Sequence, residues 1–96
     1  MADLPNAARA AMRIDKFLWF ARLAKTRSAA QAMAESGAIR LDGRRVERAH
    51  QPVRIGSVLT LMLGNAVRVL RVEGLPRRRG PAPEAATLTT ELANPS

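Results

Sequence analysis

Five basic side chains lie close together in the first third of the chain, and their types suit the binding of phosphate groups. The five are Arg13, Lys16, Arg22, Lys25 and Arg27. Guanidinium groups bind phosphate through paired hydrogen bonds, and lysine adds a compact positive charge. A lone run of charge is usually a solvated helix face, but five cations offset only by Asp15 favour a nucleic-acid interface.

A helix start and further basic residues extend this candidate site. Thr26 stands where a helix can begin, so the free backbone N–H groups of that helix would add to the positive charge. A second cluster contains Arg40, Arg44, Arg45 and Arg48. If it lies beside the first cluster, the two would span neighbouring phosphates. We expect a third group, residues 77–79, to add only non-specific affinity, because basic triplets are common in linkers.

The overall charge agrees with an anionic partner. The chain has a formal net charge of +8, and residues 9–79 hold all 16 basic side chains but only five of the eight acidic ones. Such an excess fits nucleic acid, an anionic membrane surface or an acidic protein. Arginine outnumbers lysine by fourteen to two, which favours recognition of phosphates and of base faces.

The composition gives little support to catalysis or to metal binding. The chain contains no cysteine and a single histidine, His50, so we expect no disulfide, metal site or cofactor. No nucleophile beside a base and no glycine-rich phosphate loop can be found, so we expect no enzyme activity. No apolar run approaches the length of a membrane helix, and we expect a soluble, cytoplasmic protein without membrane contact.

Two short helices must position the first cluster. Apolar residues recur at steps of three and four between residues 14 and 24, which predicts a helix with one buried face. Thr26 is a suitable N-cap for a second helix that runs to about Ser36, with Gly37 in the left-handed position after it. The predicted link is only residues 25–26, so the helices must pack as a pair.

A small antiparallel sheet follows the helices. The Asp42-Gly43 pair between residues 38–41 and 44–46 predicts a hairpin with a two-residue turn. Residues 58–63 and 66–72 read as two further strands joined by Gly64-Asn65. Because both faces of the last strand carry apolar residues, it is either covered on both sides or interrupted by a bulge. The fold class is therefore α+β, a short helix pair on a small, mainly antiparallel sheet.

The flanks differ in composition from this central part. We expect residues 1–12 to be a flexible lead-in, residues 13–73 to form the domain, and residues 74–96 to be a basic, proline-rich linker and tail. Residues 84–92 have thin apolar content, enough at most for a short docking segment. All three aromatic residues fall between positions 17 and 20. Phe17 reads as core, whereas Trp19 either stacks on a base or packs against the sheet.

The sequence also resembles a known family. The resemblance rests on residues 13–22, on residues 25–30, on Gly37 and on the Asp42-Gly43 turn, and it covers about residues 13–72. These resemble the RNA-binding domain first recognised in small-subunit ribosomal protein S-four. The start of the first helix and the later Arg77, Arg78, Glu84 and Ala85 are most similar to the ribosome-associated heat-shock proteins of bacteria, whose members commonly continue into a longer basic helix.

The resemblance implies a structure and a role. The family grips RNA with the face of its helix pair, and its binding positions correspond here to Arg13, Lys16, Arg22, Lys25, Thr26, Arg27 and Gln31. The heat-shock members bind free large ribosomal subunits that still hold a nascent chain on transfer RNA. For this chain we accordingly expect ribosomal RNA and the large subunit as partners, with transfer RNA or DNA as further candidates, and a monomer.

Three alternatives are open. The chain could be a general RNA- and DNA-binding module without ribosome specificity. It could be the targeting module of an RNA-modifying enzyme, although no catalytic domain follows the predicted strands. It could also bind protein through an exposed strip of Leu59, Leu61 and Leu63, although burial in the core explains these leucines more simply.

Overall fold

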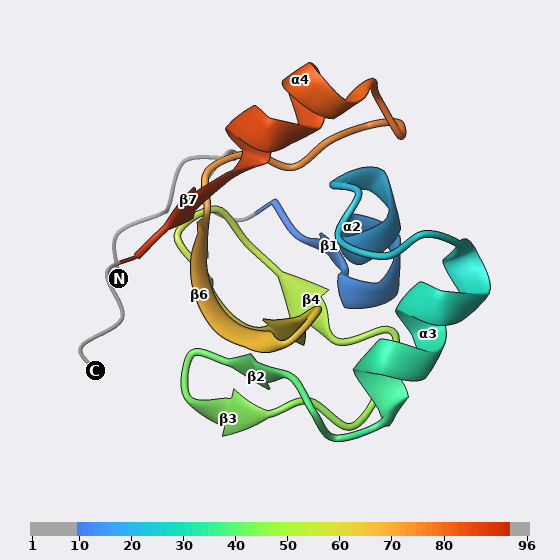
Figure 1. The fold of residues 1–96 in the computed structure, drawn as a ribbon, viewed down its shortest axis with the longest axis vertical. Helices are drawn as coiled ribbons and strands as arrows, with labels where there is room; N and C mark the ends of the chain where they lie inside the picture. Colours follow the sequence, from blue (N-terminus) through green and yellow to red (C-terminus); the bar gives the residue numbers. More distant parts are fainter. Residues whose placement is uncertain (1–9, 93–96) are drawn as a thin grey trace.

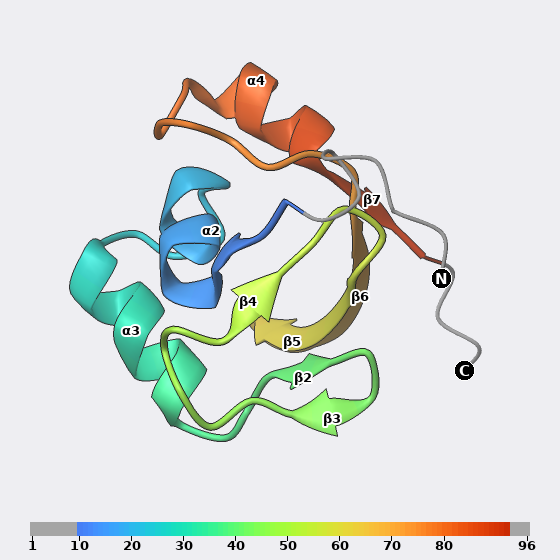
Figure 2. The same cartoon turned by 180° about the vertical axis from the view of Figure 1, so that it is seen from behind.

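Two helices pack against one face of a curved antiparallel sheet, and a third, short helix lies at one end of it (Figure 1). This arrangement comes from a computed structural model, which describes residues 10–92. The view from behind shows α2 and α3 on one side of the molecule and β6 on the other (Figure 2). The predicted α+β class, with a helix pair on a mainly antiparallel sheet, is confirmed.

The first helix, α2, spans Ile14–Phe20 and ends earlier than we predicted. Arg22 adopts a left-handed backbone with φ of 60°. The N–H of Leu23 donates to the carbonyl of Leu18 at 2.9 Å, and the N–H of Arg22 donates to that of Trp19 at 3.2 Å. This pair of bonds is a Schellman helix end, usually built on glycine. The apolar spacing up to Ala24 continues because the residues after this turn still face the core.

The second helix, α3, spans Arg27–Glu35 and has the ends that the sequence predicts. The side chain of Thr26 accepts a hydrogen bond from the N–H of Ala29 at 3.0 Å. Gly37 follows with φ of +80°. Ala30 and Ala34 are fully buried, which confirms the inward face. The link between the helices is longer than the predicted two residues, because α2 stops at Phe20.

The main sheet has five strands in the order β3-β2-β5-β6-β7, and every neighbouring pair is antiparallel. Strands β2 (Arg40–Leu41) and β3 (Arg44–Arg45) form the predicted hairpin. Asp42 and Gly43 have φ of 52° and 83°, as a type I′ turn requires. The carboxylate of Asp42 also accepts a hydrogen bond from the N–H of Val58 at 2.9 Å, which fixes the hairpin to the next strand.

Strands β5 (Val58–Leu63) and β6 (Ala66–Val72) match their predicted bounds. Their register is regular along the whole pairing, so β6 carries no bulge against β5. Nor is β6 covered on both sides, since Leu70 is buried while Val67 is 49% exposed. Both predicted explanations are therefore wrong, and the outer valines sit on an open face of the sheet. Leu59 and Leu61 are buried, so the predicted core role of this strand is confirmed.

Two segments outside the predicted elements are also structured. Met12 and Arg13 form β1 (Met12–Arg13), which pairs with β4 (Pro52–Val53), so order begins before the predicted start at Arg13. Residues 1–9 of the predicted lead-in lie outside the described residues.

The C-terminal segment differs from the linker that we expected. It contains α4 (Ala82–Ala85), the short 3-10 helix η1 (Ala86–Leu88) and β7 (Thr89–Glu91). Strand β7 pairs with β6 at the edge of the sheet. Ala85 is buried and Leu88 packs against the core, so a few small apolar contacts together with strand pairing hold the segment in place. Within residues 10–92, no helix is long and apolar enough to cross a membrane.

Candidate nucleic-acid interface

The start of α3 presents two cations on an exposed surface. Lys25 and Arg27 flank the N-cap Thr26, and all three residues are exposed. Neither cation pairs with an acid within residues 10–92. The first N–H groups of α3 have no intrahelical partner, and the positive end of the helix dipole lies here. This geometry can bind a phosphate group.

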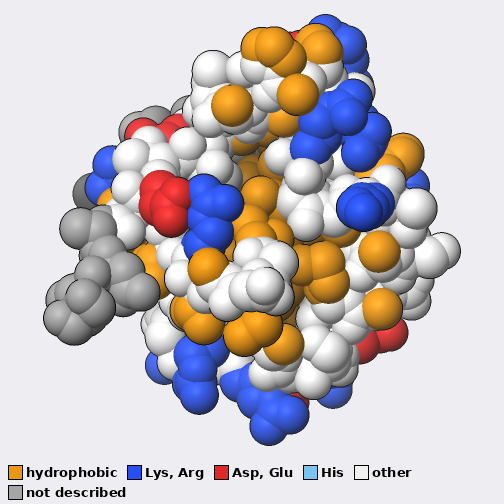
Figure 3. All heavy atoms as spheres, viewed as in Figure 1, with side chains coloured by type: hydrophobic (Ala, Val, Ile, Leu, Met, Phe, Trp, Pro, Cys, Tyr) orange, Lys and Arg blue, Asp and Glu red, His pale blue; other side chains and the backbone are white. Residues whose placement is uncertain are grey.

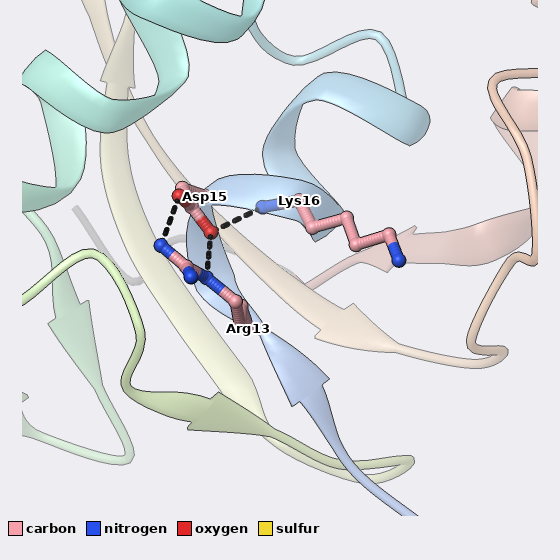
Figure 4. Close-up of polar contacts among 3 residues, drawn as sticks. All are labelled: Arg13, Asp15 and Lys16. Carbon is pink, nitrogen blue, oxygen red and sulfur yellow. Dashed lines mark hydrogen bonds and ion pairs between the residues drawn. The ribbon is translucent and has the colours of Figure 1, made fainter.

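Arg13 is held by an acid rather than free. Its guanidinium donates two hydrogen bonds to the carboxylate of Asp15, at 3.0 and 2.9 Å, and the backbone N–H of Lys16 donates a third at 2.7 Å (Figure 4). The hydrogen bonds from Arg13 and the attraction of the carboxylate raise the pKa of its guanidinium. Asp15 is buried whereas half of the Arg13 side chain is exposed. The acid that sits among the predicted cations therefore neutralises one of them.

Lys16 lies on the same helix without such a partner. Its ammonium group is 5.5 Å from the centre of the Phe20 ring, within the range of a cation–π contact. No acid within residues 10–92 pairs with it.

Trp19 is half-buried, and two arginines lie close to its ring. The guanidinium carbons of Arg27 and Arg79 are 5.9 and 5.7 Å from its ring centre. The indole also packs against the core, and its ring centre is 5.5 Å from that of Phe20. Of the two readings that the sequence left open, packing is present in the described structure, and the ring is only partly accessible from outside.

Arg22 combines a structural and an electrostatic role. It ends α2 in a left-handed conformation, and its Nε donates to the carbonyl of Gly80 at 2.6 Å. The remaining guanidinium nitrogens are on an exposed residue and have no acid partner within residues 10–92. The bond to Gly80 ties the turn after α2 to the C-terminal segment.

The hairpin cations lie at the opposite end of α3. Arg40 and Arg45 face each other across β2 and β3, and Arg44 stands beside them, all exposed. The guanidinium of Arg45 covers Gly37, where an added Cβ would come within 2.3 Å of its Nη2. Helix α3 thus separates Lys25 and Arg27 at its start from the hairpin cations by its length of roughly 13 Å. Gln31 is exposed on α3 between them.

The surface view shows this distribution. Basic side chains gather over the loop that leads into α4 and over the turn after α2, and others lie over the β2–β3 hairpin (Figure 3). Apolar side chains fill the area between the two groups (Figure 3). Lys25 and Arg27 therefore lie at one end of α3 and the hairpin cations at the other, so the predicted residues do not meet at one point.

Sequence reasoning missed the contribution of residues 79 and 80. Arg79 donates from Nε to the carbonyl of Trp19 at 3.1 Å, and Gly80 accepts from Arg22. Both contacts join residues about sixty positions apart, and the composition of this stretch indicates a linker. Within residues 10–92, no group of His, Cys, Asp and Glu side chains is arranged to hold a metal ion.

The family follows from comparison with known proteins. Residues 12–59 match the model of the S4 domain, and the chain belongs to the S4 domain family. Its similarity to particular proteins extends over more of the chain than the domain match does. It is 40% identical to heat shock protein 15 of Escherichia coli K12 over 82 residues, which are 85% of this chain and 61% of that protein. It is also 40% identical to the heat shock protein 15 homologue of Haemophilus influenzae over 80 residues, or 83% of this chain and 60% of the relative.

A solved structure agrees with this placement. Heat shock protein 15 of Vibrio cholerae, described as trimeric, superposes with a TM-score of 0.82 at 38% identity, over 88% of this chain and 84% of that one. The predicted resemblance is thereby confirmed. The chain spans about three fifths of the length of the curated relatives above. The individual binding residues stay predictions.

Proposed function

We propose that the chain binds structured ribosomal RNA through its helix-pair face, defined as Arg13, Lys16, Arg22, Lys25, Thr26, Arg27 and Gln31. The observation that carries the proposal is the start of α3, where Lys25 and Arg27 flank a capped helix N-terminus with no acid partner in the described chain. The S4 domain match adds support, because it covers this same region. The hairpin cations Arg40, Arg44 and Arg45 form the second contact area.

Such a face would recognise shape and phosphate spacing more than base sequence. The deep major groove of double-helical RNA is closed to side chains, so proteins mostly contact its phosphates and 2′-hydroxyl groups. Arg13 would contribute directed hydrogen-bond donors rather than net charge, because Asp15 holds its guanidinium in one orientation at the start of α2. Lys25 and Arg27 supply uncompensated charge.

The cellular role that we propose is the binding of free large ribosomal subunits that carry a nascent chain on transfer RNA, in the cytoplasm and under heat stress. Support comes from the resemblance to the ribosome-associated heat-shock proteins and from the two relatives named heat shock protein 15 or its homologue. The proposed contact needs a single copy, because every residue of the helix-pair face belongs to one chain. The expected monomer has to be compared with the trimer of the Vibrio cholerae relative, by sedimentation equilibrium.

The alternative is a general RNA- and DNA-binding module. The abundance of arginine favours it, because phosphate contacts alone do not select a sequence. Competition between ribosomal RNA and duplex DNA of equal length distinguishes the two proposals.

The main test is co-sedimentation with separated ribosomal subunits, and with large subunits that are vacant or loaded with peptidyl-transfer RNA. The variant Lys25→Gln with Arg27→Gln is compared with the control Arg68→Gln with Arg71→Gln, which removes the same net charge from β6, where Arg68 pairs with Glu91 and Arg71 with Glu73. We expect the first variant alone to lose its binding to loaded large subunits. Equal binding of the native protein to every RNA would support the general RNA- and DNA-binding module instead. An equal loss of binding in both variants would refute the assignment of RNA binding to the helix-pair face.

A further inference from the structure

The segment formed by residues 75–80, here called the C-terminal strap, is tied to the helix pair by two reciprocal hydrogen bonds. Arg79 of the strap donates to the carbonyl of Trp19 at 3.1 Å. In return, Arg22 of the helix turn donates to the carbonyl of Gly80 at 2.6 Å. The strap therefore lies directly against the end of α2, next to the helix-pair face.

The strap is anchored at both ends. Leu75 before the arginines and Leu88 after them pack against the core, and Gly80 is buried. The N–H of Glu73 donates to the carbonyl of Leu88 at 2.8 Å, which closes the base of the segment. Strand β7 then pairs with β6. These contacts give Arg79 a defined position, unlike that of a cation on a loose linker.

Like charges converge around Trp19. Arg27 and Arg79 both lie within 6 Å of its ring centre, and Arg22 reaches the same strap. Within residues 10–92, none of the three arginines forms an ion pair with an acid. Glu84 lies close in sequence, but its carboxylate pairs with Arg78 at 3.1 Å. Such a group repels itself in the free protein, and a bound anion would relieve the repulsion.

We propose that Arg79 is a phosphate contact and that the C-terminal strap extends the helix-pair face across Trp19, so that one RNA backbone contacts Lys25, Arg27 and Arg79. This inference rests on the proposed RNA binding. The cation–π contacts leave the guanidinium charges in place, and each guanidinium has more N–H donors than its protein contacts use. The three positive side chains come from α3, from the turn before it and from the strap.

The test separates an RNA contact from a purely structural link. In Arg79→Gln the side-chain amide can still donate to the Trp19 carbonyl, but the charge is lost. The control is Arg71→Gln, which removes one positive charge from β6, where Arg71 pairs with Glu73. Affinity for a ribosomal RNA fragment is measured by fluorescence anisotropy of labelled RNA at several salt concentrations, and thermal unfolding checks the fold of each variant.

We expect the slope of log K against log salt to become less steep by roughly 0.7 to 0.9 in Arg79→Gln and to stay unchanged in Arg71→Gln. Arg79→Lys, which keeps the charge, should retain the slope of the native protein even if it is less stable. Trp19, the single tryptophan of the chain, should change its emission on binding, because the RNA phosphates would lie close to the two arginines that contact its ring.

Two failures can be told apart. A native protein whose RNA binding is absent or insensitive to salt would overturn the proposed function. Steep salt dependence in the native protein with the same slope in Arg79→Gln would overturn only the role of the strap. Unchanged Trp19 emission at saturating RNA would also contradict the proposed contact.

Discussion

The salt dependence of RNA binding gives the sharpest prediction for the helix-pair face. Of its five cations, Arg13 is compensated by Asp15, which leaves Lys16, Arg22, Lys25 and Arg27 to neutralise phosphates. Each neutralised phosphate contributes roughly 0.7 to 0.9 to the slope of log K against log salt, so this face should give a slope of roughly −2.8 to −3.6. A fourfold increase in salt would then weaken binding roughly 50- to 150-fold.

Replacing Lys25 and Arg27 by glutamine should halve the contribution of this face and so make the measured slope less steep by roughly 1.4 to 1.8. Through this face alone, the same increase in salt should then weaken the double variant only roughly 7- to 12-fold, because two of its four phosphate contacts are lost. The assay is fluorescence anisotropy of a labelled ribosomal RNA hairpin at four or more salt concentrations. The control, Arg68→Gln with Arg71→Gln, has the same net charge but changes β6.

The result that would refute this reasoning is an equal change of slope in both double variants, because net charge and not position would then decide the affinity. If Arg79 also contacts RNA, as proposed above, the helix-pair face and Arg79 together contribute roughly −3.5 to −4.5 to the slope, and phosphate contacts of the hairpin cations add to this value. The difference caused by Lys25 and Arg27 stays the same.

Three further predictions concern stability. Thr26→Ala should lower the free energy of unfolding by about 1 kcal/mol and Tm by roughly 4 to 8 °C, because the N-cap bond to α3 is lost, whereas Thr26→Ser should not; thermal unfolding followed by circular dichroism checks this. Gly37→Ala should lower the free energy of unfolding by about 1 kcal/mol, because the backbone at this position is left-handed. The added methyl group should also displace the Arg45 side chain that covers Gly37, which crystallography would show. The hydrogen bond from Arg68 lowers the pKa of Glu91 below its ordinary value of 4.5, so the stability of this pair is complete above that pH and is lost as the pH falls through the lowered pKa. Urea unfolding between pH 6 and 3 should therefore show a smaller loss of stability in Glu91→Gln.

Much of the fold could be predicted from the sequence, because local signals specify its central elements. Thr26 and Gly37 mark the two ends of α3, and the Asp42-Gly43 turn marks the first hairpin. The early end of α2 could not be predicted in this way. The apolar spacing runs on past Phe20, and arginine at position 22 is not a residue type that signals a left-handed helix end.

The C-terminal segment shows the limit of composition as a guide. Proline and arginine indicate a linker, yet residues 75–80 are fixed by hydrogen bonds to Trp19 and Arg22, about sixty positions earlier, and by strand pairing beyond them. Such long-range backbone contacts leave no local pattern. For the candidate site, the sequence indicated which residues carry charge, but it could not show that Asp15 compensates Arg13 or that Arg79 joins the group around Trp19.

The order of strands in the sheet has a consequence for folding during synthesis. Strand β3 turns back on β2, then β5 joins β2, β6 joins β5 and β7 joins β6, so each later strand pairs with one already made. Within this sheet, a growing chain can therefore add the strands in the order in which they leave the ribosome, whereas the two-residue strand β1, outside this sheet, pairs with the later β4. Such a sequence of short-range closures shortens the time during which open strand edges can aggregate.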